Sequence, residues 1–295
     1  MTKLSINEKI MIEGHDSKGD QLKFRHNGRW FKVDRMGYEG FAEAVVSNIL
    51  QKSNIENFVP YREELIEYDG RVYRGCSSPD FKPDEMDIVT TDKLFRANYG
   101  KSTMDVCRQD SLENTISCFV ETVSKLTKIP EEEMGKYLTS MLELDALVLN
   151  EDRHFNNIAF LRYNGMYMPA PLFDHGASLL SDMDYFPLNR DTEDLLRRVD
   201  VKPFCKSFEK QVQAAENLFG KQLQLDIENI WECIPEDSTY PLEIRERVED
   251  VLEIQKEKYP ELFVSEPTLE EVIEKVRKDA GRAGQEKAVE RGWER

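Results

Sequence analysis

The chain has 295 residues, 40% of them hydrophobic, and a formal net charge of -17. This length and apolar content suffice for a substantial buried core, in one large domain or in two lobes that share a cleft. No apolar run reaches the roughly 18 to 20 residues of a transmembrane helix, and the negative field disfavours nucleic-acid binding. The acidity either tolerates a basic protein partner or only keeps the chain soluble.

The N-terminal residues and the cysteines favour a cytoplasmic protein. Glu8 and Glu13 interrupt the segment in which a signal peptide would need an unbroken apolar core. The five cysteines are widely spaced and include no C-x-x-C pair, which is typical of reduced thiols. The four histidines show no metal-binding spacing, so structural zinc is not expected.

Two β-hairpins are predicted in the first part of the chain. Residues 21–25 and 29–33 are β-prone runs that flank an Asn-Gly pair, the strongest short hairpin signal. Residues 65–68 and 71–74 flank an Asp-Gly pair in the same way. We therefore expect a small β-rich unit here.

One helix is predicted between these hairpins, over residues 38–53. Its apolar residues Phe41, Val45 and Ile49 are spaced by four, which places them on one face. Residues 75–90 contain Pro, Ser and Gly and are predicted to be a connector.

The rest of the chain is predicted to be mainly helical. Helical periodicity, usually with acidic starts and basic ends, covers residues 112–128, 132–149, 192–219, 222–233 and 241–258. A short hairpin interrupts these helices, with strands at 158–163 and 166–171 around an Asn-Gly pair.

These elements predict an α+β fold with two lobes. Residues 1–90 would form a small β-rich N-lobe with one helix, and residues 91–295 a larger, mainly helical C-lobe with a cleft between them.

A polar cluster lies at each end of the inserted hairpin. Asp152 and Asn157 belong to the string D-R-H-F-N-N before it, and Asp174 belongs to F-D-H-G after it. Because a hairpin goes out and returns, we expect Asn157 and Asp174 to lie close together and to suit Mg²⁺, which takes carboxylates plus substrate phosphates. Asp152 would stand beside the metal and orient or deprotonate an attacking hydroxyl. The alternative is that these are ordinary polar loop residues.

A lysine in the first predicted sheet adds a third element. Lys32 is bracketed by Phe31 and Val33 in a strand, where it either faces solvent at an edge or pairs with a carboxylate on the next helix. Glu43 is the expected partner, and Glu39 competes with it one helical turn earlier. A lysine–glutamate pair of this kind would hold the ammonium against nucleotide phosphates.

The segment from Gly14 to Gly19 is either a phosphate-covering turn or a plain polar turn. It matches neither a Walker A motif nor G-x-G-x-x-G. Ser17 and Lys18 are its candidate nucleotide-binding residues.

With these residues in place, the sequence resembles the HipA-like kinases, which are grouped with the phosphatidylinositol kinases in an atypical branch of the protein-kinase fold. The resemblance rests on the D-R-H-F-N-N string of residues 152–157, the hairpin, and F-D-H-G at 173–176, and extends more weakly to Lys32 and Glu43. It covers roughly residues 14–180, and it is to short, stand-alone members, so a toxin–antitoxin role does not follow from it. The His175 that follows Asp174 departs from many kinases, which have Phe there.

The resemblance implies an ATP- and Mg²⁺-dependent kinase of protein Ser or Thr residues, which would also phosphorylate itself. Asp152 would be the catalytic base, Asn157 and Asp174 the metal ligands, and Lys32 the contact of the α- and β-phosphates. His154 would brace the loop or stabilise charge. The segment CSSPDF after Gly75 would receive adenine as a hinge.

Other functions remain open at this stage. The chain could be a lipid or small-molecule kinase, although lipid head groups favour a basic surface. It could also be a nucleotidyl transferase that moves AMP, or a non-catalytic nucleotide-binding scaffold.

Overall fold

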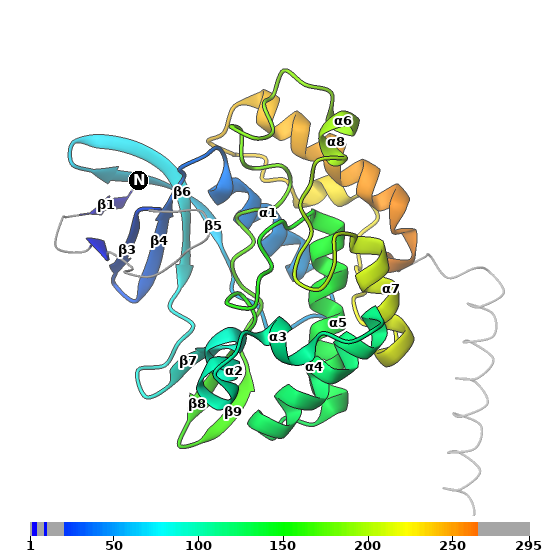
Figure 1. The fold of residues 1–295 in the computed structure, drawn as a ribbon. Helices are drawn as coiled ribbons and strands as arrows, with labels where there is room; N and C mark the ends of the chain where they lie inside the picture. Colours follow the sequence, from blue (N-terminus) through cyan, green and yellow to red (C-terminus); the bar gives the residue numbers. More distant parts are fainter. Residues whose placement is uncertain (1, 5–8, 11–20, 265–295) are drawn as a thin grey trace, which may run out of the picture.

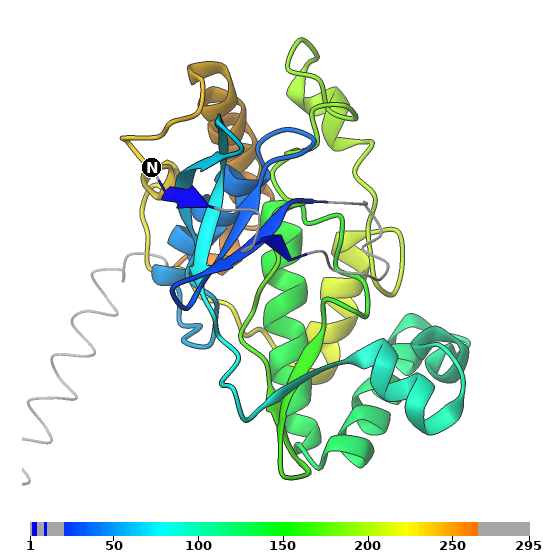
Figure 2. The same cartoon turned by 90° about the vertical axis from the view of Figure 1, so that its left-hand side faces the viewer.

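The computed structural model describes residues 2–4, 9–10 and 21–264 and shows a mixed α+β fold (Figures 1 and 2). A six-stranded sheet lies at one end, with strand order β1-β5-β6-β4-β3-β2. Its strands are β1 (Thr2–Leu4), β2 (Lys9–Ile10), β3 (Lys23–His26), β4 (Arg29–Val33), β5 (Arg62–Tyr68) and β6 (Arg71–Pro79). β1 pairs in parallel with β5, whereas the other neighbours are antiparallel.

A three-stranded sheet lies below the large sheet in the view of Figure 1, beside α2. It has the order β7-β8-β9, with β7 at Asp87–Thr90, β8 at Ala159–Tyr163 and β9 at Met166–Pro169. Both pairings are antiparallel.

Helices fill most of the remaining described chain. They are α1 (Glu39–Gln51), α2 (Thr91–Tyr99), α3 (Thr103–Cys107), α4 (Leu112–Thr127), α5 (Glu131–Val148), α6 (Thr192–Leu196), α7 (Phe208–Phe219) and α8 (Leu242–Lys258), with the short 3-10 helices η2 (Ile230–Cys233) and η3 (Pro260–Leu262). α5 is central: every residue from Leu138 to Val148 is buried, as expected of a helix that is apolar nearly all round.

Helix α1 belongs to both the large sheet and the main core. It packs on β5 and β6, while its residues Phe41, Val45 and Ile49 are fully buried in the same cluster as α4, α5, α7 and α8. Its first turn approaches β6 closely, because a Cβ on Gly40 would lie 2.6 Å from the Cα of Gly75. The missing side chain of Gly40 therefore lets the helix approach the sheet this closely.

The segment just before α8 is bonded to the large sheet, although it lies more than 150 residues further along the chain. The Arg74 Nε donates to the carbonyl of Thr239 (2.8 Å), and the Thr239 amide donates to Glu63 (3.0 Å). The Tyr240 hydroxyl donates to Asp34 (2.6 Å), and its ring stacks on Phe41 at 5.1 Å between centroids.

Many of the predicted elements are confirmed. Both N-terminal hairpins form, with the first turn at Asn27 (φ 47°) and Gly28 (φ 71°), the left-handed pair that such a turn requires. The helix between them, the inserted hairpin, and the helices predicted at 112–128, 132–149 and 241–258 are present within two residues of the predicted bounds.

Two of the predicted helices are wrong. Residues 192–219 form α6 and α7 with irregular chain between them, because Pro203 lacks an N–H and disfavours helical backbone in the residue before it. Of residues 222–233 only η2 is helical. Leu223, Leu225 and Ile227 are buried alternately, which is the period of extended chain, and Leu225 forms bridges with Ser53 and Phe263.

The connector predicted at 75–90 is also wrong over most of its length. β6 continues to Pro79, and Gly75, Cys76 and Ser77 are paired with β4 on one side and β5 on the other. Their small side chains fit this crowded central strand. Because β6 extends to Pro79, the connector is shorter than predicted and covers the chain between Pro79 and β7.

Candidate active site

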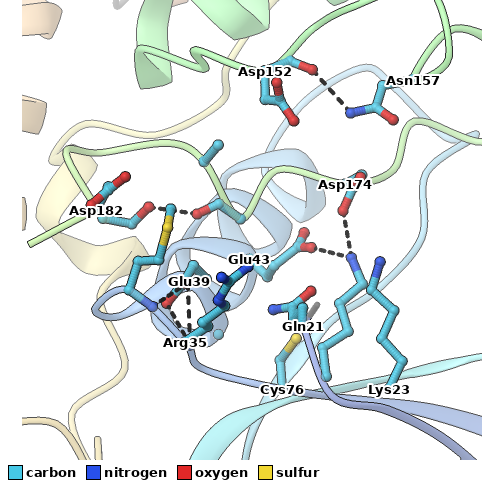
Figure 3. A pocket seen from close by; sticks show the side chains of 16 residues that line it. Gln21, Lys23, Arg35, Glu39, Glu43, Cys76, Asp152, Asn157, Asp174 and Asp182 are labelled. Carbon is cyan, nitrogen blue, oxygen red and sulfur yellow. Dashed lines mark hydrogen bonds and ion pairs between the residues drawn. The ribbon is translucent and has the colours of Figure 1, made fainter. Parts of the chain in front are cut away.

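A cleft between the large sheet and the loops around the inserted hairpin contains most of the residues singled out in the sequence (Figure 3). Lys32, Glu43, Asp152, Asn157 and Asp174 all line it. The sheet and α1 supply the first two, and the loops before and after β8–β9 supply the others.

Lys32 forms the centre of an ion cluster. Its Nζ lies 2.6 Å from Glu43 Oε1 and 2.6 Å from Asp174 Oδ1. Burial by itself would lower the pKa of Lys32, but Asp174 and Glu43 outweigh it and raise the pKa well above the usual value. Lys32 therefore stays charged, and because β4 lies between β3 and β6, its alternative placement at a solvent-facing edge is wrong.

Glu43, and not Glu39, is the helix partner of Lys32. The Glu43 side chain is 1% exposed, and its second oxygen accepts a hydrogen bond from the amide of His175 (2.9 Å). Glu39 instead accepts hydrogen bonds from the backbone amides of Met36 (2.8 Å) and Gly37 (3.0 Å) in the turn before α1. Glu43 therefore pairs with Lys32, whereas Glu39 stabilises the turn before α1.

Asp152 and Asn157 lie on the loop that follows α5. The helix ends at Leu149, which has a left-handed φ of 56°, and the chain turns into the cleft. The Asn157 amide nitrogen donates to the backbone carbonyl of Asp152 (2.9 Å), as Figure 3 shows. The Asp152 carboxylate is 2.9 Å from the ammonium of Lys202 and 3.7 Å from the His154 ring.

Arg153 braces this loop from beneath. It is completely buried and makes a bidentate pair with Asp145 of α5, at 2.8 and 3.0 Å. Its other nitrogen donates to the carbonyls of Asn157 (2.9 Å) and Phe173 (3.1 Å). One side chain thus ties together the two loops that carry the candidate metal ligands.

Asp174 has an unusual backbone conformation and a stabilised negative charge. Its φ is 61°, in the left-handed region that non-glycine residues seldom adopt, a strain that is typical of functional positions. Burial opposes ionisation, but Lys32 and then Lys23 outweigh it and hold the pKa of the carboxyl well below its usual range.

The two histidines near these aspartates differ in their surroundings. Burial, together with the neighbouring charge of Arg153, lowers the pKa of His175 well below its usual value, so His175 is neutral. Its Nδ1 lies 3.2 Å from Arg153, which supports a bracing contact. His154 lies beside Asp152 as described above, at the distance of a weak contact.

Two lysines at or near the cleft were not singled out in the sequence. Lys202 contacts Asp152 from 50 residues further along the chain, and Lys23 lines the cleft from β3. The alternation of Lys23 with the apolar Phe24 could have pointed to Lys23. No local signal marks Lys202. Ser17 and Lys18 lie outside the described residues, so their proposed nucleotide contacts stay predictions.

The residues of the cleft fit a magnesium ion that is shared with a phosphate ligand. Within residues 2–4, 9–10 and 21–264 no group of three His, Cys, Asp or Glu side chains could hold a metal by itself. Asp174 and Asn157, which carry a carboxylate and an amide oxygen, line the same cavity. Mg²⁺ usually takes one or two carboxylates and completes its coordination with waters and substrate phosphates.

Comparison with known proteins shows a shared fold but no sequence family. No protein-family model matches the chain, and no curated protein matches its sequence. The chain is similar to the Helicobacter pylori proinflammatory kinase CtkA, with a TM-score of 0.60 and 19% identity, covering 83% of this chain and 89% of that chain. A chain of the Shewanella oneidensis MR-1 HipA–HipB toxin–antitoxin complex with operator DNA matches at a TM-score of 0.41 and 12% identity, covering 84% of this chain and 65% of that chain. The first similarity shows a fold in common with a kinase, as the sequence resemblance implied.

The described chain contains neither a membrane-spanning helix nor a disulfide bond. Among the helices of the described chain, none combines the length and apolar character needed to cross a membrane. All five cysteines lie in the described chain, and each is a free thiol.

Proposed function

We propose that this chain is a Mg-ATP-dependent protein kinase that transfers the γ-phosphate to Ser or Thr hydroxyls, including its own. The observation that carries the proposal is the cluster of Lys32, Glu43 and Asp174 in one cleft with Asp152 and Asn157. The fold in common with CtkA, itself described as a kinase, supports it. The free cysteines support a cytoplasmic location.

The proposal includes a two-lobe arrangement. Residues 1–90 would cover the nucleotide, and residues 91–295 would bind the acceptor. The change from one sheet to the other falls between the end of β6 at Pro79 and the start of β7 at Asp87. The cleft lies where the sheet and α1 meet the loops that follow α5 and β9, which is where a substrate between two lobes would bind.

Each residue of the cleft has a distinct role in the proposed reaction. Lys32, oriented by Glu43, binds the α- and β-phosphates of ATP. Asn157 and Asp174 would hold Mg²⁺, which offsets negative charge on the phosphates when it is bound. Asp152 accepts the proton of the attacking hydroxyl, and Arg153 keeps its loop in place.

The ion pair with Lys32 leaves one oxygen of Asp174 for a metal. In the structure Lys32 Nζ contacts Oδ1 of Asp174 at 2.6 Å. The second carboxylate oxygen would be able to hold Mg²⁺ while Lys32 contacts the phosphates.

The test is phosphate transfer from γ-labelled ATP with Mg²⁺, using the wild type, Asp152→Asn and Asp174→Asn. Both substitutions keep the side-chain shape, and we expect each to lower transfer by a factor of about 100 or more. Asp87→Asn is the control, because Asp87 is an exposed carboxylate paired with Arg162 far from the cleft.

The outcomes separate the proposed function from its alternatives. Label on a Ser or Thr of a protein in the wild type alone supports the kinase. Label that is transferred only from α-labelled ATP indicates nucleotidyl transfer. Label on lipid or on a small molecule indicates that class of acceptor. Binding of ATP without transfer from either position indicates a scaffold.

A further inference from the structure

The charge of the Lys32 cluster is the starting point of a further inference, which rests on the proposed function. Lys32 is shared between two carboxylates, those of Glu43 and Asp174, so the three side chains together carry one net negative charge when all are ionised. With Mg²⁺ bound to Asp174, the charge of Lys32 would still be neutralised by Glu43, which lies 2.6 Å away. A triphosphate carries several negative charges, and a magnesium ion together with Lys32 would not neutralise all of them.

Lys23 is placed to supply that cation. In the antiparallel pair of β3 and β4, Lys23 is the Cα partner of Lys32, and paired residues project from the same face of a sheet. The neighbouring Phe24 is fully buried in the opposite direction, in agreement with the alternation of a strand. Both lysines line the cleft, and Figure 3 shows the Lys23 side chain rising from the sheet toward Asp174.

The electrostatic coupling agrees with this placement. Lys23 is near enough to Asp174 for its positive charge to add to that of Lys32 in lowering the pKa of this carboxyl. Arg25 lies two residues further along the same face of β3 but, unlike Lys23, does not line the cleft. Its guanidinium pairs with Asp80 at 2.8 Å.

We propose that Lys23 is a second phosphate-binding residue of this cleft, which contacts the phosphate chain of the nucleotide beside Lys32. Two ammonium groups on adjacent strands would then share the phosphates, with Lys32 fixed by Glu43 and Lys23 adding a second positive charge on the same face of the sheet. The alternative is that Lys23 only balances the charge of Asp174 in the folded protein.

The two roles differ in their dependence on the ligand. A phosphate contact strengthens the binding of ATP and ADP and has no effect on adenosine, which lacks phosphate. A charge-balancing role changes protein stability and affects all three ligands in parallel. The experiment is isothermal titration of the full chain with Mg-ATP, Mg-ADP and adenosine, for the wild type, Lys23→Met, Lys23→Arg and Arg25→Met.

We expect Lys23→Met to weaken Mg-ATP and Mg-ADP binding by a factor of about ten or more, because a hydrogen bond to a charged group is lost. Adenosine affinity should stay within about twofold, Lys23→Arg should retain most of the affinity, and Arg25→Met should resemble the wild type. Circular dichroism verifies folding, and Lys23→Gln replaces Lys23→Met if the apolar variant fails to fold.

Equal ATP affinity in Lys23→Met and the wild type, or an equal loss for adenosine and ATP, would overturn the inference while leaving the proposed function intact. A wild type that binds neither ATP nor ADP would remove both. Weaker binding of ATP and ADP by Lys23→Met, with unchanged binding of adenosine, supports the assignment of Lys23 to the phosphates.

Discussion

Arg153 is the residue whose burial and bonding most constrain the candidate active site. Its guanidinium is completely enclosed, paired with Asp145, and bonded to the carbonyls of Asn157 and Phe173. Removing one partner of a buried ion pair leaves the other charge without compensation.

We expect Arg153→Met to lower the free energy of unfolding by about 3 to 5 kcal/mol, because Asp145 would remain buried without its partner. Chemical denaturation followed by circular dichroism measures this change. Arg96→Met is the control, because Arg96 forms an exposed i,i+4 pair with Asp92, and its loss should leave the free energy of unfolding close to that of the wild type. Similar losses in the two variants would contradict the bracing role.

Lys202 forms an ion pair with the proposed catalytic base, Asp152. Its ammonium fixes one oxygen of Asp152 at 2.9 Å and thereby sets the orientation of the carboxylate that we propose as the base. Lys202 is not among the residues that line the cleft, whereas Lys32 and Lys23 are.

Lys202→Met should therefore lower kcat by a factor of about 10 to 100 while leaving the KM for ATP nearly unchanged, because a misplaced base slows transfer without affecting nucleotide binding. Steady-state kinetics with variable ATP gives both constants. Lys206→Met serves as the comparison, since Lys206 pairs with the exposed Asp200. A rise in the KM for ATP at constant kcat would argue for a nucleotide contact instead.

At the scale of the element, the placement of α1 on the sheet determines whether Glu43 reaches Lys32. The contact of Gly40 with Gly75 lets the first turn of the helix approach β6, and Glu43 follows one turn later. An added methyl group at Gly40 has only the backbone of a central strand against it, which cannot move aside easily.

Gly40→Ala should destabilise the protein by about 1 to 3 kcal/mol and reduce phosphate transfer as well, because the helix must shift away from the sheet. Thermal unfolding and the transfer assay together test this. Gly165→Ala, at a hairpin tip where an added Cβ meets nothing within 4 Å, should cost only the strain of its left-handed φ of 81° and leave transfer unchanged.

The elements that could be predicted are those with local signals. Asn-Gly and Asp-Gly pairs marked the hairpins, and apolar spacing marked α1, α4, α5 and α8. The pairings of β1 with β5 and of β7 with β8 depend on chain that is distant in sequence, so no local pattern indicated them. The error over 192–219 came from following periodicity across Pro203.

The same distinction applies to the site. Lys32 with Glu43 is a contact between adjacent elements and followed from helix and strand spacing, and the D-R-H-F-N-N and F-D-H-G strings marked the loops. Lys202 approaches Asp152 from a segment without regular structure, and Arg153 acquires its role only because Asp145 is buried beneath it. Both depend on the folded core.

At the scale of the whole molecule, stability should depend on pH through a buried carboxyl. Burial raises the pKa of Asp34 from 3.8 to about 7, although Tyr240 and the Gly40 amide donate hydrogen bonds to it. Between these two values the folded state keeps a proton that the unfolded state releases. The free energy of unfolding therefore falls as pH rises through this window, by at most about 1.4 kcal/mol per pH unit for this group.

Asp34→Asn should reduce the difference in stability between pH 5 and pH 7.5 by about 2 kcal/mol, because an amide does not titrate. Urea unfolding at the two pH values measures the difference. Some dependence should remain, since burial also raises the pKa of Glu143 to about 7. An unchanged difference in the variant would show that Asp34 is already ionised at pH 5 in the folded protein.

The contacts of Tyr240 and Thr239 with the first sheet have a consequence for synthesis on the ribosome. The partners Asp34 and Tyr240 are separated by 206 positions, which at typical translation rates corresponds to roughly 10 to 40 s of elongation. During that interval the strands and α1 have been made, but Asp34, Glu63 and Arg74 still lack their late partners. The nascent sheet therefore reaches its native contacts only after nearly the whole described chain has been translated, and a ribosome that stalls before residue 240 leaves that sheet unfinished.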